Sequence, residues 1–261
     1  MGLSIAEMRR QMRAERDPEE LVRWRRVLRA DSRAGAKPLL ERCEKQLAEI
    51  RAERKRLEGL LALREQLRRE GARFVAGVDE VGVGPLAGPV VAAAVVLHDE
   101  IDLPGLDDSK KLRRSVRERL AEQVREQAEG CAIGSASPAE IDELNIYHAA
   151  LLAMRRAVEN LRRRVVPDYV LVDARTIPGI RTRQRAIVGG DANDASIAAA
   201  SIVAKVHRDR LMRRFDEDHP GYGLGRHMGY ATAQHLSALR RLGPSPIHRR
   251  SFAPVAESEQ R

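Results

Sequence analysis

Two short apolar runs, joined by a pair of acids and a glycine-containing loop, constrain the fold of this chain most. The first run, residues 73–78, ends at the adjacent carboxylates Asp79 and Glu80. A loop with three glycines follows, and then the second run, residues 90–97. Runs of this length and composition predict neighbouring buried strands. Acids at a strand end, beside backbone that a ligand can approach closely, suit a metal-dependent phosphate enzyme, although two solvated strand-end acids fit the same pattern.

The chain after residue 70 continues as short apolar segments separated by helical patterns. Strands that begin as neighbours and later alternate with helices predict an α/β fold with a mixed sheet covered by helices. Further strands are predicted at 131–136, 169–172 and 185–188, and helices at 113–128, 138–164, 196–216 and 231–242.

The first 70 residues differ in character and predict a separate, mostly helical region. They hold 19 Lys and Arg against 13 Asp and Glu, and so carry most of the chain's net charge of +9. Asp17, followed by Pro18 and two glutamates, predicts a helix start, and a break at 35–38 precedes a longer helix. The two helices could form a hairpin that docks on the main domain, a basic arm that grips a duplex, or a solvated charged face without a partner.

Composition narrows the class of partner and the compartment. The sequence pI is near 10.1, with 47 Lys and Arg against 38 Asp and Glu, which favours a polyanion such as nucleic acid but does not exclude an anionic membrane surface. Cys43 and Cys131 lack metal-ligand spacing and indicate a reducing compartment. The longest apolar run, 90–97, is too short to span a bilayer. We therefore expect a cytoplasmic protein without a membrane partner.

Two more acids follow predicted strands. Asp173 closes the segment 169–172, and Asp191 follows the segment 185–188 after two glycines. Ligands of open α/β sheets collect at strand ends, and several hard oxygen donors without a Cys/His cluster suit Mg²⁺ or Mn²⁺ rather than zinc. Successive strand side chains face opposite ways, so Asp79 and Glu80 share one site only if the backbone bends between them. A helix cap or a turn remains the alternative role for Asp173 and for Asp191.

Several blocks together resemble one family, bacterial ribonuclease HII. The resemblance covers roughly residues 72–255, and residues 1–70 look like the helical N-terminal extension of some members. In order, the blocks are GVDEVGVGPLAGPVVAAAVVL from Gly77, DDSKKL from Asp107, NIYHAALLAM from Asn145, YVLVDA from Tyr169, GDANDASIAAASIVAKVHRDRLM from Gly190, HMGYATAQH from His227 and IHRRSFAPV from Ile247.

The resemblance implies a ribonuclease H-like catalytic domain over residues 71–261, preceded by a helical, basic extension over residues 1–70. It implies an endonuclease that hydrolyses RNA in RNA/DNA hybrids and cuts on the 5′ side of a single ribonucleotide in a DNA duplex, leaving a 3′-hydroxyl and a 5′-phosphate. Two Mn²⁺ or Mg²⁺ ions and a monomeric state are expected. By position, the family's catalytic metal ligands match Asp79, Glu80, Asp173 and Asp191, and its loop at the ribose 2′-hydroxyl matches Gly82, Val83 and Gly84. The family's phosphate contact matches Ser109 and Lys110. The aromatic residue that stacks on the sugar matches Tyr230.

Some positions depart from the family pattern and keep two rivals open. Val83 stands where arginine is usual, and Gly189, Asn193 and Met228 stand where many relatives have lysine. Ribonuclease HIII also lacks the arginine, but relatives of that type usually carry an acid at the position of Pro85 and have a sheet-containing N-terminal domain. The other rival is a non-catalytic nucleic-acid binder, although retaining four unused acids close together would be electrostatically costly.

Overall fold

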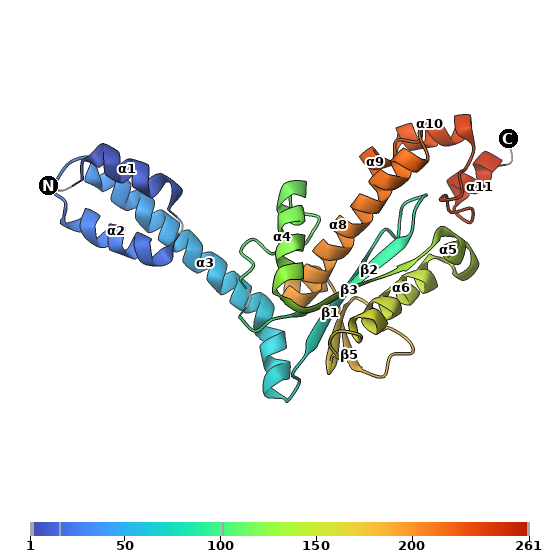
Figure 1. Ribbon diagram of the computed structural model, residues 1–261, viewed down its shortest axis with the longest axis horizontal. Helices are drawn as coiled ribbons and strands as arrows, with labels where there is room; N and C mark the ends of the chain where they lie inside the picture. The colour runs from blue at the N-terminus through green and yellow to red at the C-terminus, as the bar shows by residue number, and fades with distance from the viewer. Residues whose placement is uncertain (1–2, 16, 101, 260–261) are drawn as a thin grey trace. The chain divides into compact units, whose positions relative to one another are not determined.

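The computed structural model describes residues 3–15, 17–100 and 102–259, and it divides into two compact units between Glu58 and Gly59. This boundary lies inside the long helix α3 (Ala36–Arg69), which belongs to both units (Figure 1). The predicted boundary near residue 70 corresponds to the end of that helix.

The N-terminal unit is helical, as predicted. It consists of α1 (Ile5–Ala14), α2 (Pro18–Ala30) and the first part of α3. The predicted helix start is confirmed, because the Asp17 side chain accepts a hydrogen bond from the backbone of Glu19 at 2.9 Å. The helix α1 was not predicted. The three helices bury a common apolar core that includes Met8, Met12, Leu21, Leu28, Leu39, Cys43 and Leu47.

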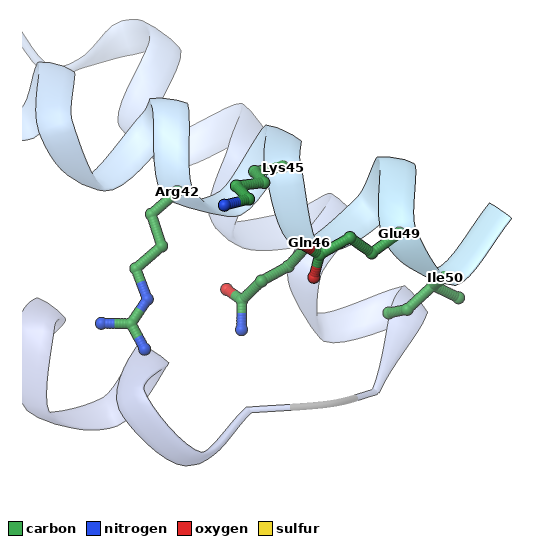
Figure 2. Close-up of a pocket in the computed structure, with 5 residues that line it drawn as sticks. All are labelled: Arg42, Lys45, Gln46, Glu49 and Ile50. Atoms are coloured by element: carbon green, nitrogen blue, oxygen red, sulfur yellow. The ribbon is translucent and has the colours of Figure 1, made fainter. Parts of the chain in front are cut away.

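A cavity lies beside α3 in the same unit. Figure 2 shows the five α3 side chains that line it: Arg42, Lys45, Gln46, Glu49 and Ile50. Both signs of charge and an apolar side chain meet there, so the lining does not have the single sign expected of a phosphate site. None of the predicted site residues lies in this unit.

The second unit contains one mixed five-stranded sheet, as predicted. Its strands are β1 (Val75–Val81), β2 (Val90–Leu97), β3 (Ala128–Ala136), β4 (Tyr169–Asp173) and β5 (Arg183–Ile187). The spatial order is β3-β2-β1-β4-β5; β1 pairs antiparallel with β2, as β2 does with β3, and β1 and β5 each pair parallel with β4. The central strand β1 is therefore the one where antiparallel and parallel pairing meet.

One long helix covers each face of this sheet. Alternate β1 residues Ala76 and Val78 pack in the apolar cluster with α6 (Ile146–Leu161). The opposite face carries α8 (Ala195–Asp218), which approaches β1 closely: a Cβ on Gly77 would lie 2.1 Å from the backbone carbon of Ser196. Glycine at this point allows the helix to lie directly on the strand that carries the two adjacent acids.

The remaining helices lie around the sheet and toward the C-terminus (Figure 1). They are α4 (Arg114–Gln127), α5 (Pro138–Leu144), α7 (Gly190–Asn193), α9 (Leu224–His227), α10 (Ala233–Leu242) and α11 (Ala253–Glu259). No helix within the described ranges combines the length and apolarity needed to cross a membrane.

Several predicted element bounds differ from the structure: β1 continues through both acids to Val81, and β3 begins at Ala128 rather than at residue 131. The helix predicted over 138–164 is broken at Asn145, whose backbone takes φ 67° and whose side chain caps α6 by accepting from the backbone of Tyr147 and His148. The strand predicted at 185–188 begins two residues earlier and stops at Ile187. It is an edge strand with largely exposed side chains, so apolarity is a weak guide to its limits.

Candidate active site

Three of the four predicted acids lie at one end of the parallel strands. Val78 of β1 is in register with Val172 of β4, so the next residues along each strand, Asp79 and Asp173, are adjacent at the end of that pair. Asp191 lies in the short helix α7, one residue after Gly190, whose backbone N–H donates to Oδ1 of Asp173 at 2.7 Å. This bond joins the end of β4 to the turn that carries Asp191.

Glu80 reaches the same region without the predicted bend. The strand β1 continues through both acids, with Asp79 opposite Ala93 and Glu80 opposite Ala92 in one unbroken register. The expectation of a bend between them was therefore wrong, because the β1–β2 ladder fixes an extended backbone there. The strand β4 ends at Asp173, so Glu80 lies beyond the edge that β4 covers, and its Oε1 is 3.4 Å from Nη1 of Arg175.

The electrostatics of these acids link all four. Burial raises the pKa of Asp79 well above its usual range, and the charges of Glu80 and Asp173 raise it further. Burial also raises the pKa of Glu80 and of Asp173, with added repulsion from Asp173 on the first and from Asp191 on the second. Like charges that perturb one another in this way lie close together, as an acidic site requires.

Lys110 and Arg175 supply positive charge to this acidic group. The Nζ atom of Lys110 lies 2.9 Å from Oδ2 of Asp191, and its charge also lowers the pKa of Asp173. Arg175 offsets part of the burial cost of Glu80. The predicted phosphate contact Lys110 is thus placed at the acids themselves.

The donor set fits a hard divalent cation, but the side chains are not gathered around one point. Within the described ranges, no three His, Cys, Asp or Glu side chains are placed to hold a metal ion together. One carboxylate oxygen, Oε2 of Glu80, is buried without a hydrogen-bond partner. A buried anionic oxygen without a partner is costly, and a cation would satisfy it. The acids fit Mg²⁺ or Mn²⁺ once the ammonium of Lys110 leaves Asp191.

Ser109 lies beneath the acids rather than at an open surface. Its hydroxyl is buried and lies 2.9 Å from the hydroxyl of Ser201 on α8. The Ser201 hydroxyl in turn lowers the pKa of Asp79 and so offsets part of the effect of burial. Ser109 is therefore connected to Asp79 through Ser201.

The predicted ribose-binding loop and Tyr230 lie side by side. Gly84 faces the aromatic ring, since a Cβ on it would lie 3.8 Å from Cε1 of Tyr230. Tyr230 is 44% exposed, so its ring is accessible to a ligand. Val83 is partly buried against the apolar cluster under α6, and its side chain adds no charge to the loop.

Three histidines near Tyr230 have structural partners. His235 and His248 are buried and face each other through their Nε2 atoms at 3.0 Å. His227 stacks on His235 with ring centroids 4.5 Å apart. His227 and His235 also pair with the backbone carbonyls of Tyr222 and Tyr230, so the contacts of all three rings are structural.

Four further residues of this region were not identified from the sequence. Arg175 contacts Glu80, and Ser201 contacts Asp79, as described above. Arg208 and Arg249 are completely buried beneath the loop of residues 82–89 between β1 and β2, called the glycine loop below. Arg175 carries a local signal, since it follows Asp173 by two residues; the others come from distant helices and loops, where spacing gives none.

Comparison with known proteins assigns the family. Residues 76–255 match the model of the family described as Ribonuclease HII, and residues 4–68 match that of the Ribonuclease HII N-terminal domain. The ribonuclease HII of Desulfitobacterium hafniense (strain Y51) is 53% identical over 227 residues, which are 87% of this chain and 86% of that protein. The ribonuclease HII of Myxococcus xanthus (strain DK1622) is 54% identical over 233 residues, covering 89% of this chain and 79% of that protein.

Among solved structures, the ribonuclease H2 of Pyrococcus horikoshii OT3 is similar with a TM-score of 0.62 and 27% identity, covering 72% of this chain and 97% of that one. The predicted ribonuclease H-like fold is confirmed. The match to the N-terminal domain, together with three helices before the first strand, decides against the ribonuclease HIII alternative. The chain belongs to the ribonuclease HII family, the metal-dependent endoribonucleases of the type 2 ribonuclease H class.

Proposed function

We propose that this chain hydrolyses RNA in RNA/DNA hybrids and also cuts on the 5′ side of a single ribonucleotide embedded in a DNA duplex, leaving a 3′-hydroxyl and a 5′-phosphate. One observation carries this proposal. Asp79 and Glu80 lie near the end of β1, the glycine-containing loop follows them directly, and Gly84 of that loop lies against Tyr230. The acids suit phosphodiester chemistry, and the loop and ring suit recognition of one sugar. Family membership supports the same substrate class.

Asp79, Glu80, Asp173 and Asp191 are the proposed ligands of two Mg²⁺ or Mn²⁺ ions. Bound divalent ions would activate a water and neutralise charge on the departing oxygen. The protein's part is to hold four anionic side chains at low solvent exposure around one strand end; Asp79, for example, is 6% exposed. The raised pKa values of Asp79 and Asp173, caused mainly by burial, and the unsatisfied oxygen of Glu80 support a role as cation ligands.

The substrate contacts follow from the surroundings of the acids. Lys110 is 79% exposed at its side chain and is free to exchange Asp191 for a backbone phosphate. Ser109 supports Asp79 through Ser201 and precedes Lys110 at the proposed phosphate contact. Gly82, Val83 and Gly84 present main-chain groups to the ribose 2′-hydroxyl, the group that distinguishes RNA from DNA. Tyr230 stacks on the sugar at the RNA–DNA junction.

The proposed setting is the cytoplasm, with the enzyme acting as a monomer on hybrid or ribonucleotide-containing duplexes. Cys43 and Cys131 are both free thiols, which fits a reducing compartment. The net charge of +9 favours binding to the phosphate backbone.

The experiment that tests this function uses a DNA duplex with one ribonucleotide, an RNA/DNA hybrid and an all-DNA duplex. Each is incubated with the enzyme and Mg²⁺ or Mn²⁺, with and without a chelator, and the product ends are identified. We expect metal-dependent cuts in the first two duplexes, on the 5′ side of the lone ribonucleotide, with 3′-hydroxyl ends. Intact ribonucleotide duplex, or cleavage that persists in chelator, would contradict the proposal.

A further inference from the structure

Arg249 is fully buried, and its guanidinium donates hydrogen bonds to backbone carbonyls of the glycine loop. Its relative exposure is 0%. Its Nη2 donates to the carbonyl of Gly82 at 2.6 Å, its Nη1 to that of Val83 at 2.9 Å, and its Nε to that of Gly88 at 3.0 Å. Each nitrogen of the guanidinium therefore holds one backbone carbonyl, and the three carbonyls span the whole loop.

Burial of this cation without a directly bonded carboxylate is energetically expensive. Burial, together with the neighbouring charge of Arg208, lowers the pKa of Arg249 to about 9. An apolar side chain would fill the same space without this desolvation cost. The guanidinium supplies something that an apolar side chain cannot, namely three fixed donors in one plane.

The orientation of two peptide groups follows from these bonds. In a trans peptide, the carbonyl and the N–H point in opposite directions. The Gly82 carbonyl points at Arg249, so the N–H of Val83 points away from it; likewise the Val83 carbonyl fixes the N–H of Gly84. Within the described residues, neither of these two N–H groups donates to a protein acceptor. Both are left for a ligand.

Arg208 fixes the same loop against the segment that carries Tyr230. Its three nitrogens donate to the carbonyls of Pro89, Ala87 and Met228, each at 3.0 Å. Only glycine fits at position 82, for two reasons. Its φ of 89° is unfavourable for other residues, and a Cβ there would lie 2.2 Å from Nε of Arg208. The loop therefore rests on Arg208, and its outward face lies toward the Tyr230 ring.

We propose that Arg249 is a positioning residue for ribonucleotide recognition: by holding the carbonyls of Gly82 and Val83, it directs the N–H groups of Val83 and Gly84 at the ribose oxygens of the substrate. This inference rests on the proposed function, since it specifies how the loop reads the 2′-hydroxyl. It also explains how a loop with valine at position 83 recognises a ribonucleotide, because the orienting cation lies beneath the loop and not on it.

The test compares binding of two duplexes that differ in one hydroxyl. An Asp173→Asn background is used because we expect it to slow cleavage at least about 100-fold. In it, dissociation constants are measured by fluorescence anisotropy for a DNA duplex with one ribonucleotide and for the all-DNA duplex of the same sequence. Arg249→Gln and Arg249→Lys are then added separately. We expect the preference for the ribonucleotide duplex to fall about tenfold in either variant, since two backbone hydrogen bonds lose their orientation. Affinity for the all-DNA duplex should change less than about twofold.

Arg64 offers a control arginine, although unlike Arg249 it also donates to a carboxylate, Oδ1 of Asp99 at 2.8 Å. It is also a buried arginine whose guanidinium donates to backbone carbonyls, those of Leu97 at 3.0 Å and His98 at 3.1 Å, and it does not contact the glycine loop. Arg64→Lys should lower thermal stability while leaving the ribonucleotide preference intact. This control separates a loss of general packing from a loss of recognition.

The outcomes are distinguishable. If the Asp173→Asn protein with Arg249 intact shows no ribonucleotide preference, the proposed function itself fails, and the inference with it. If that protein prefers the ribonucleotide and folded Arg249→Lys retains the full preference, only the inference is overturned. Should Arg249→Gln not fold, by circular dichroism, the Lys variant decides alone, since it retains the charge but cannot bridge three carbonyls. Equal losses on both duplexes would also overturn the inference, because they indicate a purely structural role.

Discussion

The ammonium nitrogen of Lys110 lies 2.9 Å from Oδ2 of Asp191. One of the four carboxylates of the site is therefore already paired with a lysine. A divalent ion that binds this carboxylate has to displace the ammonium. Lys110→Met should therefore tighten Mn²⁺ binding to the substrate-free protein severalfold, on the order of one surface ion pair. Isothermal titration calorimetry with Mn²⁺ alone measures this.

Lys111 provides the comparison for that experiment. It pairs with Asp107 at 3.2 Å and does not contact the four acids. Lys111→Met should leave Mn²⁺ affinity unchanged. If both variants behave alike, or if Lys110→Met weakens the ion, Asp191 is not a ligand that competes for the ammonium.

Asp173 is the acid whose removal should separate catalysis from binding. Its Oδ1 accepts from Gly190 at 2.7 Å, and asparagine retains this acceptor while losing the charge. Asp173→Asn should reduce Mg²⁺-dependent cleavage at least about 100-fold, since even outer-shell partners of metal sites cost 10–100-fold. Affinity for an RNA/DNA hybrid should change little. Initial rates and anisotropy on the same hybrid measure both quantities.

Asp168 is the matched aspartate outside the site. It accepts from the backbone N–H groups of Arg73 and Phe74, ahead of the first residue of β1 and away from its acidic end. Asp168→Asn keeps an acceptor there and should cleave normally. Near-normal turnover by Asp173→Asn would remove that residue from the proposed metal ligands.

The sequence was most informative where packing and chemistry impose the same pattern. The apolar runs of β1 and β2 predicted the sheet, because few other structures bury such residues continuously. The acids at 79, 80, 173 and 191 were identified because each follows or ends an apolar strand. The edge strand β5 was misplaced, since exposure leaves its residues Arg183 and Arg185 without a strand-like pattern.

The supports beneath the site could not be predicted from spacing. Arg249 reaches the carbonyl of Gly82, 167 residues earlier in the chain, and Arg208 reaches that of Ala87, 121 residues earlier. A long-range contact of an arginine with a backbone carbonyl leaves no periodic or local signature. The break at Asn145 was missed for a different reason: its cap hydrogen bonds are local, but the sequence is helical on both sides of it.

Val83 stands where the family resemblance leads us to expect arginine, and introducing arginine there should strengthen binding at the junction. Val83→Arg adds one positive charge beside Gly84 and Tyr230, on a loop that Arg249 already orients. We expect the slope of log affinity for the duplex against log salt concentration to steepen by about one. Cleavage should concentrate further at a lone ribonucleotide. Affinities at several salt concentrations and product mapping on one duplex provide the readouts.

Val166→Arg is the control for added charge alone. Val166 is 54% exposed and precedes β4, whereas the acids follow the end of that strand. It should leave the cleavage pattern unchanged. An unchanged pattern in Val83→Arg as well would count against a substrate contact at position 83.

The paired histidines predict a loss of stability at mildly acidic pH. The backbone N–H of Ser245 donates to Nδ1 of His248 at 3.0 Å, so His248 must donate from Nε2 to Nε2 of His235, which donates from Nδ1 to the Tyr230 carbonyl at 2.9 Å. A further proton on either ring would bring two donors together. Burial accordingly lowers the pKa of His248, with a further contribution from the charge of His235, to about 4.

The direction of the change in stability with pH follows from the lowered pKa of His248. An unfolded histidine takes up a proton near pH 6.5, whereas folded His248 resists until about pH 4, so its contribution to stability is present above pH 6.5 and is lost as the pH falls toward 4. Between pH 7 and pH 5, the free energy of unfolding should fall by about 2 kcal/mol from this residue. His248→Gln keeps a donor toward His235 without a titrating ring, and its stability should fall by correspondingly less over the same range. Urea unfolding followed by circular dichroism measures the difference, with His98→Gln at an exposed position as the control. Equal pH dependence in the wild type and in His248→Gln would show that His248 does not carry the effect.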